Sequence, residues 1–240
     1  MIDIVIPTMV HCDTGGLKYS ITQAMSSEHV SKIIIIDNSG ESKFSKELDF
    51  HPDIGGRDKL IIRTMENNIY VNPAWNLGVS LCSSPNVLIM NDDIFCHHKV
   101  YDQVNRVMNQ LNVGICSVTT KGCRSVDDYL KYIDDFEDLI KTISTFEHPD
   151  KKKSGWFFCV KKKIWKDIPS ELKIFYGDDL IFERTKHLGY ESKNIVSCTI
   201  GHMGSSTVMS KTGGLRPTIH KTLMEEHVPY QRAKKKYWEK

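Results

Sequence analysis

Residues 86–97 read NVLIMNDDIFCH, an apolar run that stops abruptly at Asn91, Asp92 and Asp93. A short apolar run between polar residues is typical of a strand buried on both faces of a parallel sheet. Acidic side chains at the carboxyl end of such a strand lie where open α/β sheets bind ligands. Two adjacent carboxylates repel each other, and a cation such as Mg²⁺ or Mn²⁺ relieves that repulsion. The stretch therefore predicts a cation site at a sheet edge, with capping of the next helix as the alternative.

Three further apolar segments precede this stretch, and each ends in polar residues. Residues 2–7, 32–36 and 59–63 are predicted strands, separated by predicted helices at 14–25 and within 67–84. Strands that alternate with helices predict a parallel sheet of βα units, whose carboxyl ends share one edge. That edge is expected to carry Pro7, Thr8, Asp37, Asn67, Asn68, Asn91, Asp92 and Asp93.

The second half of the chain continues this pattern less regularly. Its expected elements are a helix at 98–111, a strand at 114–119, a helix at 127–146, a strand within 151–166, a helix at 177–187 and a strand at 194–200. A length of 240 residues suits one well-buried α/β domain. The sequence thus predicts a single domain over residues 1–210, followed by a tail at 211–240.

Charge is distributed unevenly along the chain. Residues 211–240 contain eight Lys or Arg against three Glu, a net charge of +5 that leaves −3 for the other 210 residues. Residues 151–166 add seven lysines and no acid. Such basic segments can bind an anionic partner such as DNA, or they can simply be solvated.

Cysteine usage and hydropathy indicate the compartment. The seven cysteines are scattered singly without a Cys-x-x-Cys pair, which favours free thiols in a reducing cytoplasm over disulfides or a zinc site. No apolar stretch is long enough for a membrane span, and the chain starts with a predicted strand rather than a signal peptide. We therefore expect a cytoplasmic protein without a membrane anchor, in the host cytoplasm if the protein is viral.

Six motifs occur in order along the chain. They are IDIVIPT (2–8), IIIIDNSG (33–40), NNIYVNPAWNLGV (67–79), VLIMNDDI (87–94), GWFF with FYGDDLIFERTKHLGY (155–158 and 175–190) and GHMGSST (201–207). This series resembles the family-2-like glycosyltransferases with the GT-A fold, and it covers about residues 2–207. The resemblance implies a Rossmann-like, mostly parallel sheet flanked by helices. It also implies a nucleotide-binding half at 1–100 and an acceptor half at 101–210.

The resemblance implies a binding site for a nucleotide-sugar at the first strand ends and in the Asn-rich segment. The implied residues are Pro7, Thr8, Asp37, Asn68, Asn76 and Gly78. A carboxylate at Asp37 can accept a hydrogen bond from the imide N–H of uracil, which favours UDP; the alternative is a turn residue in Asp-Asn-Ser-Gly. Asn76 could equally be a surface residue of its helix.

The resemblance also implies a metal site. Asn91, Asp92 and Asp93 take the place of the family's Asp-x-Asp motif, in which Asn91 and Asp92 are implied to contact the nucleotide-sugar; Asn in the first position weakens one sugar or ribose contact. Asp93 matches the acid that binds Mn²⁺ or Mg²⁺, and His202 matches a histidine that completes the site, although a lone histidine after a strand is often structural. Hydroxyls that could bind phosphate oxygens follow at Ser205, Ser206 and Thr207.

Asp178 and Asp179 match the family's acidic pair, from which a catalytic base would accept the proton of the acceptor hydroxyl. The spacing to Gly189 favours Asp178 and the position of Gly177 favours Asp179, to which we give slight preference. A base on the acceptor side implies inversion at the anomeric carbon. Trp156 matches a segment that lines the acceptor site, although a Trp beside two Phe also suits a core.

The residues and the resemblance together predict an inverting, metal-dependent glycosyltransferase with a nucleotide-sugar donor, expected to be linked to UDP. Two acceptor classes stay open. One is a hydroxymethylated base in DNA, as in phage enzymes, which the basic segments favour. The other is a glycan or a lipid-linked saccharide. A sugar nucleotidyltransferase would need a Gly-rich phosphate loop after the first strand, where the sequence reads Met9-Val10-His11. A non-catalytic sugar-binding relative would lack the acidic pair, which is present.

Overall fold

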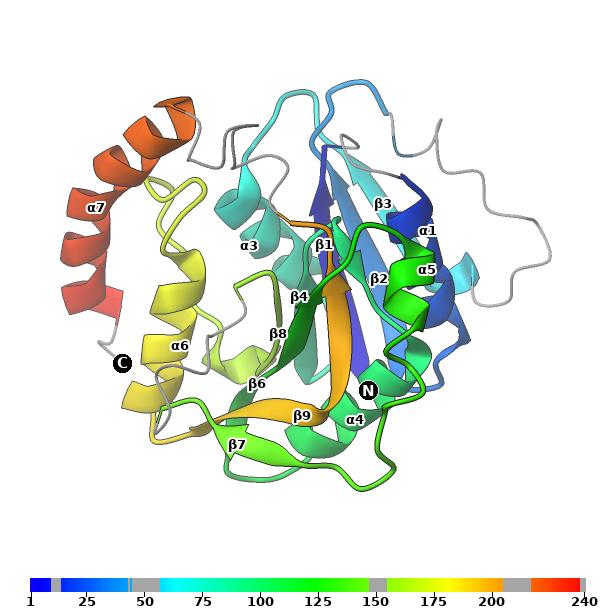
Figure 1. Ribbon diagram of the computed structural model, residues 1–240. Helices are drawn as coiled ribbons and strands as arrows, with labels where there is room; N and C mark the ends of the chain where they lie inside the picture. The colour runs from blue at the N-terminus through cyan, green and yellow to red at the C-terminus, as the bar shows by residue number, and fades with distance from the viewer. Residues whose placement is uncertain (10–13, 43, 45–56, 147–154, 205–216, 238–240) are drawn as a thin grey trace.

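Nine strands form one mixed sheet with helices on both faces in the residues that the computed structural model describes, which are 1–9, 14–42, 44, 57–146, 155–204 and 217–237 (Figure 1). The strands are β1 (Ile2–Thr8), β2 (Val30–Asp37), β3 (Leu60–Thr64), β4 (Asn86–Met90), β5 (Ile94–Phe95), β6 (Val113–Gly122), β7 (Thr142–Ser144), β8 (Phe157–Lys161) and β9 (Glu191–His202). The helices are α1 (Thr14–Ser26), α3 (Val71–Leu81), α4 (His98–Met108), α5 (Val126–Leu130), α6 (Gly177–His187) and α7 (Pro217–Tyr237), with short 3₁₀ turns η1 (Arg57–Lys59) and η2 (Lys162–Ile164).

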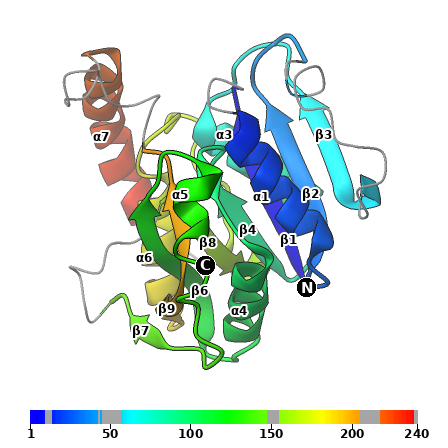
Figure 2. The ribbon, with the colours of Figure 1, turned by 45° about the vertical axis from the view of Figure 1, so that its right-hand side comes forward.

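The order of the strands confirms the predicted α/β class. Strands β3, β2, β1 and β4 lie side by side and are all parallel, so their carboxyl ends share one edge of the sheet (Figure 2). The second half is mixed: β8 runs antiparallel between β4 and β6, and β9 is parallel to β6. Strand β5 pairs antiparallel with β9, which returns the end of β9 to the edge where β4 ends.

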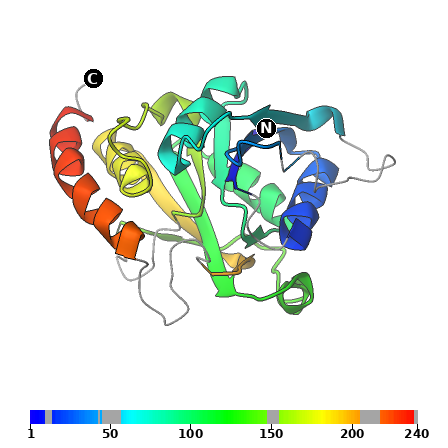
Figure 3. The same ribbon diagram turned by 90° about the horizontal axis from the view of Figure 1, so that it is seen from above.

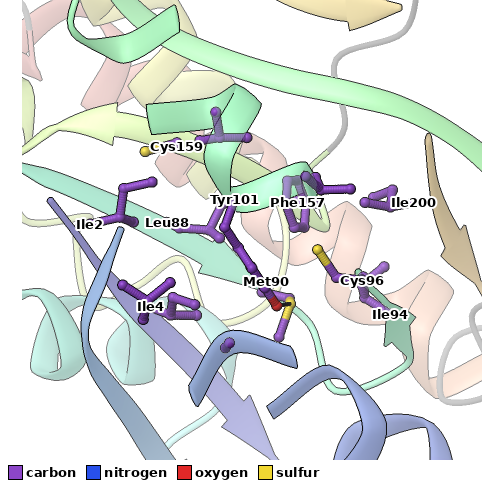
Figure 4. Close-up of a cluster of buried hydrophobic side chains, with 14 of the residues drawn as sticks. Ile2, Ile4, Leu88, Met90, Ile94, Cys96, Tyr101, Phe157, Cys159 and Ile200 are labelled. Atoms are coloured by element: carbon purple, nitrogen blue, oxygen red, sulfur yellow. Dashed lines mark hydrogen bonds between the residues drawn. The ribbon is translucent and has the colours of Figure 1, made fainter. Parts of the chain in front are cut away.

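Both faces of the sheet are buried, which explains the unbroken apolar runs of its strands. On one face, Ile2 and Ile4 of β1 join the cluster beneath α1 and α4, part of which Figure 4 shows. On the other face, Val5 belongs to the cluster beneath α3 and α6. Because side chains alternate along β1, this single strand contributes residues to the cores on both faces of the sheet.

Two predicted segments differ from the structure. The helix predicted at 127–146 is wrong, because α5 ends at Leu130 and is followed by turns and by β7. The tail, for which no structure was predicted, contains the long helix α7, which lies against the outer side of α6 (Figure 3). Tyr230 and Tyr237 of α7 are buried in the same core as α6.

The six described cysteines are buried and unpaired, as expected for free thiols; Cys12 lies outside the described residues. No helix in the described part of the chain is long and apolar enough to cross a membrane.

Candidate active site

A cavity of about 510 Å³ opens at the carboxyl edge of the parallel strands. Residues from both halves of the chain and from α7 form its walls. They are Pro7, Thr8, Met9, Asn38, Asn68, Tyr70, Val71, Trp75, Asn91, Asp92, Asp93, Gly155, Trp156, Ile174, Phe175, Tyr176, Asp178, Asp179, Ile219 and Leu223. The cavity therefore lies where open α/β sheets bind their ligands.

The structure brings Asp93 and His202 together beside this cavity. Asp93 follows β4 and His202 ends β9, and the Nε2 atom of His202 lies 3.1 Å from the Oδ2 atom of Asp93. Pairing of β5 with β9 and a hydrogen bond from Met203 N to Asp93 O (3.0 Å) fix the two backbones. The indole of Trp156 stacks on the His202 ring, with centroids 4.8 Å apart. The imidazole is thus held between an aromatic face and a carboxylate.

The second carboxylate oxygen of Asp93 differs from the one that contacts His202. Among the described residues this buried Oδ1 atom has no hydrogen-bond partner, and the same is true of the Oδ1 atom of Asn91. A buried carboxylate oxygen without a partner is costly, so a missing cation or donor is its simplest explanation. The residues present therefore fit a divalent cation held by Asp93 and His202, with a hard oxygen ligand and an imidazole that Mn²⁺ accepts.

The neighbouring acid, Asp92, is held by the first strand. Thr8 Oγ1 donates a hydrogen bond of 2.7 Å to Asp92 Oδ2. Burial raises the pKa of Asp92 to about 6, and the charge of Asp93 adds to this rise, while the Thr8 hydrogen bond opposes it. Two carboxylates at this edge are thus difficult to keep ionised without a cation.

Asp178 and Asp179 both line the cavity from the first turn of α6. The preceding residue, Tyr176, has a left-handed backbone (φ 62°), which turns the chain into the helix. A Cβ atom on Gly155 would lie 2.3 Å from the Oδ2 atom of Asp178, so the absence of a side chain at Gly155 leaves room for this carboxylate. The predicted acid pair therefore faces the same cavity as Asp93, whose partner His202 lies behind it.

The first strand ends form the other wall. Pro7, Thr8 and Asn68 line the cavity as predicted, and Asn38 lines it as well. Asn38 is held by hydrogen bonds from its N–H to Thr8 O (2.8 Å) and from Ile69 N to its side-chain oxygen (3.4 Å). Asn38 is thus a cavity residue that the sequence analysis did not predict.

Three residues implied by the resemblance have structural positions instead. Asp37 is fully buried and does not line the cavity; its carboxylate accepts hydrogen bonds from Ser39 N and Phe44 N, which corresponds to the turn role left open from sequence. Asn76 bonds reciprocally with the backbone of Ile168, at 2.8 and 3.0 Å. Gly78 permits close packing of α3 on β1, since a Cβ atom there would lie 2.2 Å from Val5 Cγ1.

Sequence reasoning also missed an apolar and aromatic part of the wall. Tyr70 and Phe175 flank the cavity, and Ile219 and Leu223 of α7 close its side. The spacing of Ile219 and Leu223, one helical turn apart, is a signal that could have been read from sequence. The predicted Ser205, with Ser206 and Thr207, lies outside the described residues.

The lining of this cavity is acidic. Four carboxylates line it, from Asp92, Asp93, Asp178 and Asp179, and its described lining contains no Lys or Arg. No group of three or more His, Cys, Asp and Glu that could enclose a metal occurs in the described residues. A cation here would therefore take its remaining ligands from bound phosphate and water, as Mg²⁺ commonly does.

No protein-family profile matches the sequence, and no curated protein matches it. Among solved structures, the chain is similar to TarS from S. aureus. A crystal structure of TarS 1–349 gives a TM-score of 0.55 at 13% identity and covers 81% of this chain and 57% of that chain. The complex of TarS 1–349 with UDP gives 0.58 at 13% identity, covering 82% and 60%.

A longer TarS structure gives a TM-score of 0.58 at 13% identity and covers 85% of this chain and 37% of that chain. This chain thus spans less than two thirds of the TarS chains it resembles. At such low identity the likeness shows a shared fold, which agrees with the α/β architecture expected from the sequence.

Proposed function

We propose that this protein is a glycosyltransferase that moves a sugar from a nucleotide-sugar to an acceptor hydroxyl. The observation that carries the proposal is the contact between Asp93 and His202, which lies beside a cavity that Asp178 and Asp179 also face. The fold likeness to TarS, itself a glycosyltransferase and seen in complex with UDP, supports this function and favours UDP as the nucleotide. Because fold does not determine function, the chemistry of the cavity is the stronger support.

The donor would lie between the first strand ends and the acid pair. Asn38 and Asn68 line this wall in the place that the sequence assigned to Asp37. Their amide oxygens already accept backbone N–H groups, from Ile69 and Tyr70, so their NH2 groups are the ones that would donate to the base and ribose. Pro7 and Thr8 line the same wall and give it a rigid backbone, because they belong to the central strand β1. This side of the cavity suits a nucleoside.

A diphosphate would be repelled by the four carboxylates of this cavity unless a cation accompanied it. Mn²⁺ or Mg²⁺ held by Asp93 and His202 would neutralise the charge of the departing diphosphate. Asn91 contributes a buried amide oxygen without a partner beside this position. Trp156 keeps the His202 ring in place by stacking on it, so its established contact is with the histidine.

On the acceptor side, Asp178 or Asp179 would accept the proton of the attacking hydroxyl as the new bond to the anomeric carbon forms. The base then lies opposite the departing diphosphate, and the configuration of the sugar is inverted. We propose that the acceptor is a hydroxymethylated base in DNA, with a glycan or lipid-linked saccharide as the alternative. The last turn of α7 supports DNA, because the exposed Lys235 and Lys236 lie there, about 18–20 Å along the helix axis from Leu223. Lys234, in the same turn, pairs with Glu183.

A thermal-shift screen of UDP, GDP and dTDP, each with and without Mn²⁺, tests the proposal. A ligand that binds the folded state raises the melting temperature by mass action. We expect the largest rise with UDP and Mn²⁺ together. Absence of a shift with every nucleotide would contradict the proposal. If a nucleotide does bind, a transfer assay distinguishes the two acceptor classes. Transfer of sugar to hydroxymethylated DNA, with a steep loss of activity on added salt, would identify DNA rather than a neutral glycan as the acceptor.

A further inference from the structure

Helix α7 presents one face to the rest of the protein. Ile219 and Leu223 line the cavity, while Tyr230 and Tyr237, further along the same face, are buried against α6. Between them stands Glu226, a carboxylate that is only 3% exposed. An acid in the middle of an otherwise apolar helix face is costly unless its oxygens are bonded, so its partners show what it does.

The partners of Glu226 are three consecutive backbone N–H groups. Its Oε1 atom accepts hydrogen bonds from Lys173 N (2.9 Å) and Ile174 N (3.1 Å), and its Oε2 atom accepts from Phe175 N (2.8 Å) and from Ile174 N (3.3 Å). Successive N–H groups that converge on one anion form a strong, charge-assisted arrangement. A single side chain of α7 thus fixes the backbone of residues 173–175.

The opposite side of the same segment is held by α3. The side-chain amide of Asn72 donates to Leu172 O (3.2 Å) and Phe175 O (2.9 Å), and its backbone N–H donates to Lys173 O (3.0 Å). Asn72 is fully buried. Residues 172–175 are therefore clamped between Glu226, which binds their N–H groups, and Asn72, which binds their carbonyl groups.

The clamped segment, residues 172–175, comes just before the acid pair in the sequence. Tyr176, the next residue, has the left-handed backbone that starts α6, and its ring stacks on Tyr230 of α7 at a centroid distance of 4.5 Å. Asp178 and Asp179 follow in the first turn of that helix. Since the direction of a helix start is set by the backbone that leads into it, a displacement of residues 173–175 moves both carboxylates.

We propose that Glu226 is a positioning residue for the acid pair, and that α7 thereby belongs to the active site rather than to a separate basic tail. Glu226 lies behind the cavity wall and does not touch the substrate. It acts through the backbone of residues 173–176, which places Asp178 and Asp179 opposite Asp93. This role rests on the proposed glycosyltransferase function.

The test compares Glu226→Gln with Tyr237→Phe in the full chain. Gln has the same shape, but its amide nitrogen cannot accept from a backbone N–H, so half of the clamp is lost. Tyr237→Phe removes a hydrogen bond from the Tyr237 hydroxyl to Lys166 O at the far end of α7 and serves as the control. Glu226→Asp, which keeps both oxygens on a shorter side chain, is the conservative variant.

Three quantities are measured: UDP affinity with Mn²⁺ by calorimetry, hydrolysis of whichever of UDP-glucose, UDP-galactose and UDP-N-acetylglucosamine the wild type cleaves, and hydrogen exchange of residues 172–180. For Glu226→Gln we expect faster exchange at residues 173–175, a fall in kcat of about tenfold or more from misplacement of the base, and KM and UDP affinity within about twofold of wild type. Glu226→Asp should recover part of kcat, and Tyr237→Phe should leave kcat and local exchange unchanged.

The outcomes separate the two claims. If the wild type does not bind UDP, the proposed function fails, and the role of Glu226 in it fails as well. If the wild type binds and cleaves the donor but Glu226→Gln retains full kcat, or loses it no more than Tyr237→Phe does, the positioning role is wrong and the proposed function stands.

Discussion

Asp93 and His202 are 109 positions apart in the sequence, yet their side chains meet at 3.1 Å, and the other oxygen of Asp93 has no partner in the part of the chain that the structure describes. The antiparallel pairing of β5 with β9 produces this contact, because it places the end of β9 beside the residue that follows β4. Because Asp93 also lines the cavity, this unbonded oxygen is a position at which a ligand could be held.

The acid pair is tested by replacing Asp178 and Asp179 with Asn, singly and together. Whichever carboxylate accepts the proton, its Asn variant should lose donor hydrolysis by about 100-fold or more, since general base catalysis contributes roughly 10²–10⁴. The other single variant should keep most activity, and both should bind UDP normally. Normal turnover by the double variant would remove the pair from the mechanism.

Gly155→Ala distinguishes between the two acids by a different route. The added Cβ atom would lie 2.3 Å from Asp178 Oδ2, so the carboxylate of Asp178 must move. If Asp178 is the base, we expect a loss of kcat of about tenfold or more with little change in melting temperature. Gly122→Ala is the control, because no described residue beyond its two chain neighbours lies within 4 Å of the Cβ that it would add. Unchanged kcat in Gly155→Ala would point to Asp179.

Asn76 should matter for stability and not for donor binding. Asn76→Ala removes both hydrogen bonds to the backbone of Ile168, and we expect it to lower the free energy of unfolding by about 1–3 kcal/mol. Ser80→Ala, on an exposed side of the same helix, should change it far less. Chemical denaturation measures both. A large loss of UDP affinity in Asn76→Ala at unchanged stability would restore the nucleotide contact implied by the family resemblance.

The lowered pKa of His97 predicts how the free energy of unfolding depends on pH. Burial, together with the nearby His98 and Lys99, lowers the pKa of His97 from 6.5 to about 4. In the unfolded chain it binds a proton near pH 6.5, whereas in the folded protein it does so only near pH 4. The neutral ring therefore stabilises the fold fully above pH 6.5, and that stability is lost as the pH falls from about 6.5 to about 4.

His97→Asn removes this titration and keeps a side chain that can cap α4, where His97 now accepts a hydrogen bond from Lys99 N. At pH 5 we expect the variant to lose about 1 kcal/mol less stability than the wild type, relative to pH 7, after allowance for solvent screening. Denaturation midpoints at the two pH values measure this difference. Parallel pH profiles of the two proteins would contradict the assignment.

The first half of the fold was predictable from sequence for a physical reason. Strands β1 and β4 are buried on both faces and β2 along most of its length, so each appears as an apolar run, and the polar residues that end these runs mark one sheet edge. Strand β3, at the edge of the sheet, is only half-buried. The pairing of Asp93 with His202, by contrast, was implied only by the family resemblance. What the sequence could not show is which polar groups at that edge are consumed by the backbone, as those of Asp37 are.

The second half was less predictable because its elements depend on distant partners. Tyr129, Tyr132, Ile133 and Phe136 have helical spacing, but only Tyr129 packs from a helix, the short α5, and the other three pack from the turns that follow it. In α7, lysines and an internal Pro229 conceal the apolar spacing. Glu226 is recognisable as a core position only once its backbone partners, some fifty residues away, are known.

The most direct test of the central claim is the affinity of UDP measured by calorimetry in Mn²⁺ and again in EDTA, for the wild type and for Asp93→Asn. If Asp93 and His202 hold a cation that binds the diphosphate, UDP binds the wild type in Mn²⁺ at least about 100-fold more tightly than in EDTA, a difference of about 2.7 kcal/mol. Asp93→Asn should lose most of this gain. Equal affinity with and without Mn²⁺, or an undiminished gain in Asp93→Asn, would contradict the account.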